Sequence, residues 1–317
     1  MNNLEKQREY LSLFTQQKIS MSDIYQVLED TKDIKTNYHN YMTTKPINCE
    51  VELERVSQAD YKTCCALLTM ILREDHFCEG SFEKRYDRGQ VDLVIERMLY
   101  LLFEEVQDIK TFVELLSSYK VQGKNIHNQY QNPIVKNNLY QYLTYLQRYG
   151  VDVLFVGEAA GYLGCRITGI PFTDEVQLKN EKNYFALGEW ERDSNCGNTV
   201  EKSATDIGEA LQRRDEKLVP LMWNAFPFHP HKEGNEESNR APLVKEMKVG
   251  KLFIEQLKRI FNIDDANVYS IGRKAQEQLG LSEEQYIRHP SYGGKIECQE
   301  KIMGIKIKKS HLSGLNG

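Results

Sequence analysis

Three short apolar runs in the second half of the chain constrain its fold more than any other feature. The runs cover residues 151–156, 218–223 and 267–271, and helical patterns at 203–213 and 243–260 lie between them. A short apolar run that ends at a turn is typical of a strand buried on both faces. Strands that alternate with helices form a parallel sheet with helices on both sides. With a further strand near Ile287, we predict an α/β fold of three αβα layers around a short parallel four-stranded sheet.

The first half of the chain has a different pattern, which is helical. Apolar residues recur at three- and four-residue steps from Val91 to Leu116, and again between Leu139 and Leu146, and residues 51–72 are also predicted to be helical. The pattern changes at Gly150, and a chain of 317 residues exceeds the size of most single domains. We therefore predict two domains, a mostly α-helical one of unknown role at 1–149 and an α/β one at 150–317.

Cysteine usage and charge limit the setting and the partners. The chain has seven cysteines, an odd number, and no C-x-x-C motif. This makes a disulfide framework unlikely and favours a reduced, cytoplasmic protein. The first residues are polar, and the longest apolar stretch, 93–103, contains two charges, so no membrane association is expected. A net charge of −5 argues mildly against extensive phosphate contacts, although a local basic groove in an acidic protein can bind DNA. No obligate protein partner is evident.

The loops after the predicted strands carry the unusual residues, at the sheet edge where parallel sheets bind ligands. They read GEAAGYLGCRITGIPF at 157–172, NAFPFHPH at 224–231 and HPSYGG at 289–294. The three loops together resemble the uracil-DNA glycosylase superfamily. The first is similar to the GEAPG opening of the iron–sulfur enzymes and to the G-x-x-x-T-G-x-P-F of the single-strand-selective monofunctional enzymes, and the third to the start of the DNA-intercalating loop. The resemblance extends from about residue 151 to 294.

This resemblance implies a uracil-DNA glycosylase-like domain that flips a base out of DNA, single- or double-stranded, and hydrolyses its N-glycosidic bond. In such a domain Phe172 stacks on the base, and the Asn224 amide reads its Watson–Crick edge. Gly157 and Gly161 belong to the same base-binding loop. His289 donates a hydrogen bond to the carbonyl oxygen O2 as charge builds on the leaving base. The alternative interpretations are structural: Phe172 is a core residue, Asn224 caps a strand end, and the hydrogen bonds of His289 are satisfied within its own loop.

The rest of the third loop is implied to contact DNA. Ser291 and Tyr292 would hold a phosphate and wedge into the vacated stack, and Gly293 belongs to the same DNA-binding loop. No lysine occupies a matched position, although Lys274 and Lys295 lie nearby, so the resemblance implies a monofunctional enzyme that leaves an abasic site, as in base-excision DNA repair.

Two departures from the family pattern concern water and cofactors. Ala159 stands where many relatives have a water-positioning Asp or Asn, which leaves Glu158 as the candidate to orient the water. The four-cysteine pattern of the iron–sulfur enzymes is missing, with only Cys165 and Cys196 in the first part of the domain, so no cluster and no other cofactor is expected. His229 and His231 lack companions at ligand spacing, so no metal site is predicted either.

A third departure concerns the substrate. Uracil enzymes that exclude thymine carry a tyrosine at the position of Gly161. The glycine leaves the side of the pocket facing the 5-position open, unless Tyr162 or the segment 173–200 folds over it. Uracil, hypoxanthine-like, hydroxymethyl-type and bulkier modified bases, such as those of phage DNA in an antiviral role, therefore remain candidate substrates. A non-catalytic DNA- or protein-binding module that retains the fold is the alternative, and a phosphate-binding loop is disfavoured because G-x-G-x-x-G is missing.

Overall fold

The computed structural model describes residues 3–14, 18–103, 106–121, 123–179 and 197–306. Contacts divide the chain into two compact units, Met1–Val106 (unit 1) and Gln107–Gly317 (unit 2). Among the described residues, none of the helices is both long enough and apolar enough to span a bilayer.

Unit 1 is helical, as expected, and it is built around one central helix. Its helices are α1 (Asn3–Phe14), α2 (Met21–Asp30), α3 (Cys49–Leu53), α4 (Tyr61–Phe77), α5 (Ser81–Asp87) and α6 (Gln90–Phe103), with 3-10 turns η1 (Tyr38–Tyr41) and η2 (Val56–Gln58). Asp60 caps α4 by accepting the Thr63 N–H at 2.7 Å. Every residue of α4 from Cys64 to Leu72 is buried, which is typical of a helix surrounded by others.

The apolar spacing from Val91 to Leu116 belongs to two helices rather than one. α6 ends at Phe103, and α7 (Ile109–Ser118) begins after Asp108, whose carboxylate accepts the Thr111 N–H at 2.8 Å. Because a capping side chain satisfies the first free N–H groups, a new helix can start there while the spacing of the apolar residues stays the same.

Unit 1 contains a buried carboxylate that should make its stability depend on pH. The Glu52 side chain is fully buried, and its Oε1 accepts hydrogen bonds from the N–H and hydroxyl groups of Thr43 and Thr44. Burial by itself would raise the pKa, but these hydrogen bonds outweigh it and lower the pKa from its usual 4.5 to about 2. The ionised form therefore stabilises the unit above pH 4.5, and this contribution is lost as the pH falls from 4.5 toward 2.

Glu52→Gln should accordingly lower the stability of unit 1 at pH 7 by up to about 3 kcal/mol, which is the free energy equivalent of such a pKa shift. Hydrogen exchange of peptides from 43–55 should speed up at pH 7 in this variant, and the difference from wild type should shrink toward pH 3. The exposed neighbour provides the control, because Glu54→Gln should leave the exchange unchanged. Equal effects of the two substitutions would contradict the assignment.

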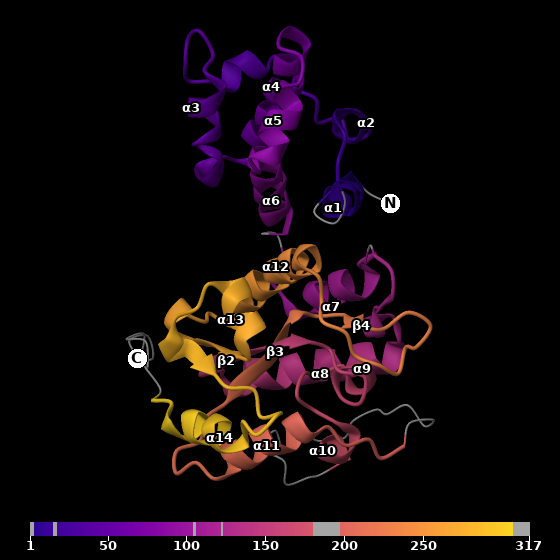
Figure 1. The fold of residues 1–317 in the computed structure, drawn as a ribbon, viewed down its shortest axis with the longest axis vertical. Coiled ribbons are helices and arrows are strands. Elements are labelled where there is room, and N and C mark those ends of the chain that lie inside the picture. Colours follow the sequence, from indigo (N-terminus) through magenta and orange to yellow (C-terminus); the bar gives the residue numbers. More distant parts are fainter. Residues whose placement is uncertain (1–2, 15–17, 104–105, 122, 180–196, 307–317) are drawn as a thin grey trace. The chain divides into compact units, whose positions relative to one another are not determined.

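Unit 2 is a three-layer α/β fold with a four-stranded sheet, which confirms the expected fold class. The sheet consists of β2 (Val153–Ala159), β3 (Pro220–Phe226), β5 (Val268–Ile271) and β6 (Tyr286–Ile287). The strands are all parallel and lie in the order β3-β2-β5-β6. In Figure 1, α12 (Val244–Ile260) and α13 (Arg273–Leu279) lie on one side of the sheet, and α11 (Lys202–Gln212) and α14 (Lys295–Gly304) lie on the other.

The remaining elements of unit 2 are short or lie at the sheet edges. They are β1 (Ile126–His127), η3 (Gln129–Gln131), α8 (Pro133–Tyr149), α9 (Cys165–Thr168), α10 (Glu175–Lys179), β4 (His229–Pro230), η4 (Asp265–Asn267) and η5 (Glu283–Gln285). β1 and β4 pair antiparallel as a separate two-stranded sheet.

The division by contacts differs from the boundary that the change of pattern at Gly150 predicted. Residues 107–149 lie in unit 2, because α7 and α8 complete the core around β3. The Phe112 ring of α7 lies 5.6 Å from the Trp223 ring, and the Tyr142 hydroxyl of α8 accepts the Met222 N–H at 2.8 Å. Among the described strands β3 is at the edge of the sheet, and α8 thus supplies an acceptor for one of its N–H groups.

Candidate functional site

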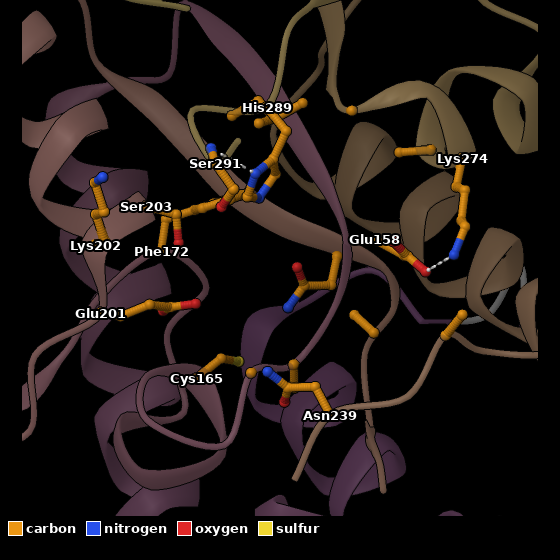
Figure 2. A pocket seen from close by; sticks show the side chains of 18 of the residues that line it. Glu158, Cys165, Phe172, Glu201, Lys202, Ser203, Asn239, Lys274, His289 and Ser291 are labelled. Carbon is orange, nitrogen blue, oxygen red and sulfur yellow. Dashed lines mark hydrogen bonds and ion pairs between the residues drawn. The ribbon is translucent and has the colours of Figure 1, made fainter. Parts of the chain in front are cut away.

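The carboxyl ends of the four strands surround a cavity of about 610 Å³, here called the strand-end cavity (Figure 2). It brings together most of the residues that the sequence singled out: Glu158, Ala159, Gly161, Phe172, Asn224, His289, Ser291 and Tyr292. Gly157 and Gly293 are not among its lining residues. Loops that are distant in the sequence meet here because parallel strands end at one edge of the sheet.

Gly157 lies directly beneath two of the cavity's side chains. It pairs with Asn224 across β2 and β3, and a Cβ on it would lie 2.4 Å from Phe172 Cζ and 2.9 Å from Asn224 Oδ1. A side chain at this position would displace both, so glycine is required for the close approach. Gly157 therefore supports the aromatic ring and the amide from below rather than lining the cavity itself.

Phe172 is held in an unfavourable backbone conformation by its neighbours. Its φ is +53°, which non-glycine residues rarely adopt, and its side chain is mostly buried. The Thr168 hydroxyl accepts the Ile170 N–H at 3.1 Å and donates to the Thr173 carbonyl at 2.8 Å, which fixes the turn on both sides. Backbone strain of this kind persists where the surroundings enforce it, and it is common at binding sites.

Asn224 and Cys165 meet at the base of the cavity. The Asn224 side chain is buried and lies within hydrogen-bonding reach of the Cys165 thiol. The thiol also contacts Gln129 Nε2 at 3.8 Å and the Tyr130 hydroxyl at 3.7 Å. Burial raises the pKa of Cys165 to about 12, so it stays a neutral thiol and orients the amide.

The surroundings of His289 determine which of its nitrogens carries the proton. Its Nδ1 accepts the Ser291 N–H at 3.2 Å, as Figure 2 shows. Burial lowers the pKa of the imidazole, although the charge of Glu158 opposes this, so the ring is neutral at pH 7. A neutral imidazole that accepts at Nδ1 carries its proton on Nε2. His289 therefore offers one hydrogen-bond donor at the cavity.

Ser291, Tyr292 and Gly293 form a turn at the rim. Tyr292 has a φ of +54° and is 99% exposed, and Gly293 has a φ of +82°. Two consecutive left-handed residues project the phenol ring away from the protein.

Glu158 and Ala159 lie at the end of β2, where Ala159 contributes only a methyl group. The Glu158 carboxylate forms a 2.9 Å ion pair with Lys274 Nζ of α13, and both side chains are partly exposed (Figure 2). Arg240 and Arg273 also line the cavity, as does Lys202. Three of these four cations pair with carboxylates, Lys274 with Glu158, Arg240 with Glu246 and Arg273 with Glu283.

Glu201 is a cavity residue that the sequence did not reveal. It precedes α11, outside the three loops, and its pKa is raised to about 7 by burial, against a hydrogen bond from Ser203 and with help from the charge of Asp174. A Cβ on Gly161 would lie 2.8 Å from its Oε1, and one on Gly164 would lie 1.9 Å from its Oε2. The space that Gly161 was expected to leave open is thus occupied by a carboxyl group. The two glycines were the available sequence signal, because they indicate that something packs against the loop.

His229 and His231 support the structure of the second loop. The His229 ring lies between two carbonyl oxygens, of Ala160 at 2.7 Å from Nδ1 and of Glu236 at 3.0 Å from Nε2, and it stacks on His231. Within the described part of the chain, no group of three His, Cys, Asp or Glu residues is placed to hold a metal ion. Cys196 and residues 180–196 of the segment expected near the cavity lie outside the described residues.

Comparisons with known proteins give a family match in unit 1 and a distant structural similarity. Residues 6–103 match the model of a family of unknown function (DUF6508). No curated protein matches the chain. Among solved structures, the chain is similar to the crystal structure of wild-type Pedobacter heparinus SMUG2, with 16% identity and a TM-score of 0.45. That similarity covers 61% of this chain and 94% of the other.

Proposed function

We propose that unit 2 is a monofunctional DNA glycosylase that hydrolyses the N-glycosidic bond of a flipped-out pyrimidine and leaves an abasic site. The observation that carries the proposal is the meeting of Phe172, Asn224 and His289 in one cavity, from three separate strand ends. An aromatic face, an amide edge and a neutral imidazole donor are the groups needed to stack on a base, read it and stabilise its departure.

Each group acts on a different part of the bound nucleotide. The base stacks on Phe172 and exchanges two hydrogen bonds with the Asn224 amide, which Cys165 helps to orient. His289 Nε2–H donates to O2 as the glycosidic bond breaks and the base gains negative charge. Glu158, placed by Lys274, orients the attacking water in place of a side chain at Ala159.

The rim and the basic side chains support DNA as the partner. The projecting Tyr292 ring would enter the stack that the flipped base leaves, and Ser291 and Gly293 would contact the neighbouring phosphate. Lys202 and the ion-paired Arg240, Arg273 and Lys274 would meet the phosphate backbone at the strand-end cavity, so binding should weaken as salt rises.

The test is base release from oligonucleotides that contain a single uracil or modified pyrimidine, with strand cleavage by alkali as the readout. We expect alkali-labile sites with the wild-type protein. Asn224→Ala should lower the single-turnover rate about 10²-fold, since two hydrogen bonds to the base are lost in a buried site. The control is Asn235→Ala, the same chemical change in an exposed turn outside the cavity, which should leave the rate unaltered.

A specific result would favour a non-catalytic binding module instead. Ala159 motivates that alternative, because it removes the familiar water-positioning group. If the wild-type protein bound DNA but released no base from any oligonucleotide in the panel, and Asn224→Ala bound equally well, the glycosylase proposal would be rejected.

A further inference from the structure

The Glu201 carboxyl lines the same cavity as the amide that would read the base. Its two oxygens pack against Gly161 and Gly164, and its charge acts on the Cys165 thiol, which in turn lies within hydrogen-bonding reach of Asn224. In Figure 2 the Glu201 side chain points into the cavity on the side of Phe172 and Cys165, away from the Glu158–Lys274 pair. The carboxyl and the amide therefore line the same cavity and both act on the Cys165 thiol.

The hydrogen bonds of Glu201 limit what it can contact. Its own N–H donates to Asp174 Oδ2 at 2.8 Å, which fixes the backbone at the start of α11. A ligand that fills the cavity removes the remaining water from the carboxyl. The Ser203 side chain already donates one hydrogen bond to the carboxyl. A carboxyl oxygen that has only water as a partner would lose it, which weakens binding, more so when the group is charged. The ligand should therefore supply a donor in addition to Ser203.

We propose that Glu201 is a specificity-determining residue, an inference that rests on the proposed function. It selects bases that carry a hydrogen-bond donor next to the edge read by Asn224. On a pyrimidine read at N3 and the 4-position, that donor is the second N–H of a cytosine's exocyclic amine, on the C5 side, or a hydroxymethyl group on C5. An ionised carboxylate accepts hydrogen bonds only, so it favours such donors and repels the O4 carbonyl of uracil or thymine. When protonated, the same carboxyl donates and admits a carbonyl.

This selection should depend on pH between 6.5 and 8.5. Burial raises the pKa of Glu201 to about 7, so the carboxyl passes from mostly protonated to mostly ionised across that range. Among the described residues, the charged or titratable groups around it are Asp174 at its backbone and, lining the cavity, Glu158, Cys165, Lys202, Arg240, Arg273, Lys274, His289 and Tyr292. The pKa of His289 lies below its usual 6.5 and that of Cys165 is about 12, so neither of these two groups titrates in the window.

The experiment compares matched bases in the same single-stranded oligonucleotide: cytosine with uracil, and 5-hydroxymethyluracil with thymine. Binding is measured by fluorescence anisotropy, and base release by alkaline cleavage, at pH 6.5 and 8.5. For the wild-type protein, we expect the preference for the donor-bearing base to be at least tenfold at pH 8.5 and several-fold smaller at pH 6.5. Glu201→Gln, which has the same shape and both a donor and an acceptor, should remove the pH dependence of this preference.

The control is Glu209→Gln, an equivalent change on α11 at a carboxylate that pairs with Lys295 outside the cavity, which should keep the wild-type preference. A preference that is the same at both pH values in the wild-type protein would overturn the inference, whether or not the Gln variant folds. So would a wild-type pH dependence in Glu201→Gln. Selective binding without base release would support the role of Glu201 and reject the glycosylase proposal, so the two can fail separately.

Discussion

Replacing His289 with alanine is expected to lower the rate of base release by about 10²- to 10³-fold, the loss seen when one donor to a developing oxyanion is removed. The reason lies in its hydrogen bonds. Because Nδ1 accepts the Ser291 N–H, Nε2 carries the proton, and burial keeps the ring neutral. The neutral His289 ring can donate its Nε2–H to the charge that develops on O2 without first gaining or losing a proton.

His289→Gln tests whether hydrogen-bond donation matters rather than the imidazole ring itself. A glutamine amide also donates, so this variant should recover part of the rate. His76→Ala is the control: this histidine is exposed near the end of α4 in unit 1 and is not among the cavity residues. The measurement is the single-turnover rate at pH 7.5 with saturating protein, so that weaker DNA binding does not mimic slower chemistry. A rate for His289→Ala within threefold of wild type would show that this imidazole does not stabilise the leaving base.

The sheet and the convergence of the loops could be predicted from the sequence because both follow from local patterns. Apolar runs that end at Gly157 and near Asn224 indicate buried parallel strands, and the geometry of such a sheet places their ends at one edge. Phe172, Asn224 and His289 therefore meet, although they are far apart in the chain. Which side chain each would contact did not follow from the pattern. The pairing of Gly157 with Asn224 and the ring of Phe172 above them require the three-dimensional register.

Glu201 and the position of α7 and α8 could not be predicted, because both depend on packing between distant segments. Nothing near Glu201 marks it as different from a solvated glutamate at the start of a helix, and its environment is formed by Gly161 and Gly164 of another loop. The apolar faces of α7 and α8 show that they are buried, but periodicity does not say against which core. The aromatic contact of Phe112 with Trp223 shows that α7 packs against the core around β3.

The second large effect is expected at Gly250, in the middle of α12. A Cβ there would lie 1.6 Å from the carbonyl oxygen of Ala225 and 2.7 Å from its carbonyl carbon. These are backbone atoms of β3, so the clash cannot be relieved by moving a side chain. Gly250→Ala should therefore destabilise unit 2 by about 3 kcal/mol or more, the upper end of overpacking effects. In an unobstructed helix the same change usually stabilises by up to about 1 kcal/mol, so the sign of the effect is diagnostic.

The matched control is Gly304→Ala at the end of α14, where a Cβ would meet no atom within 4 Å, and where we expect little change or a small gain. Urea unfolding followed by the fluorescence of Trp223, in a Trp190→Phe background, reports on the core around β3. A Gly250→Ala protein as stable as wild type would mean that α12 does not approach β3 so closely. Ala225 directly follows Asn224, so any shift of β3 also moves the amide. Total base release by Gly250→Ala should therefore fall by a larger factor than the folded population does. The reason is that the contact between α12 and β3 sets the position of Asn224.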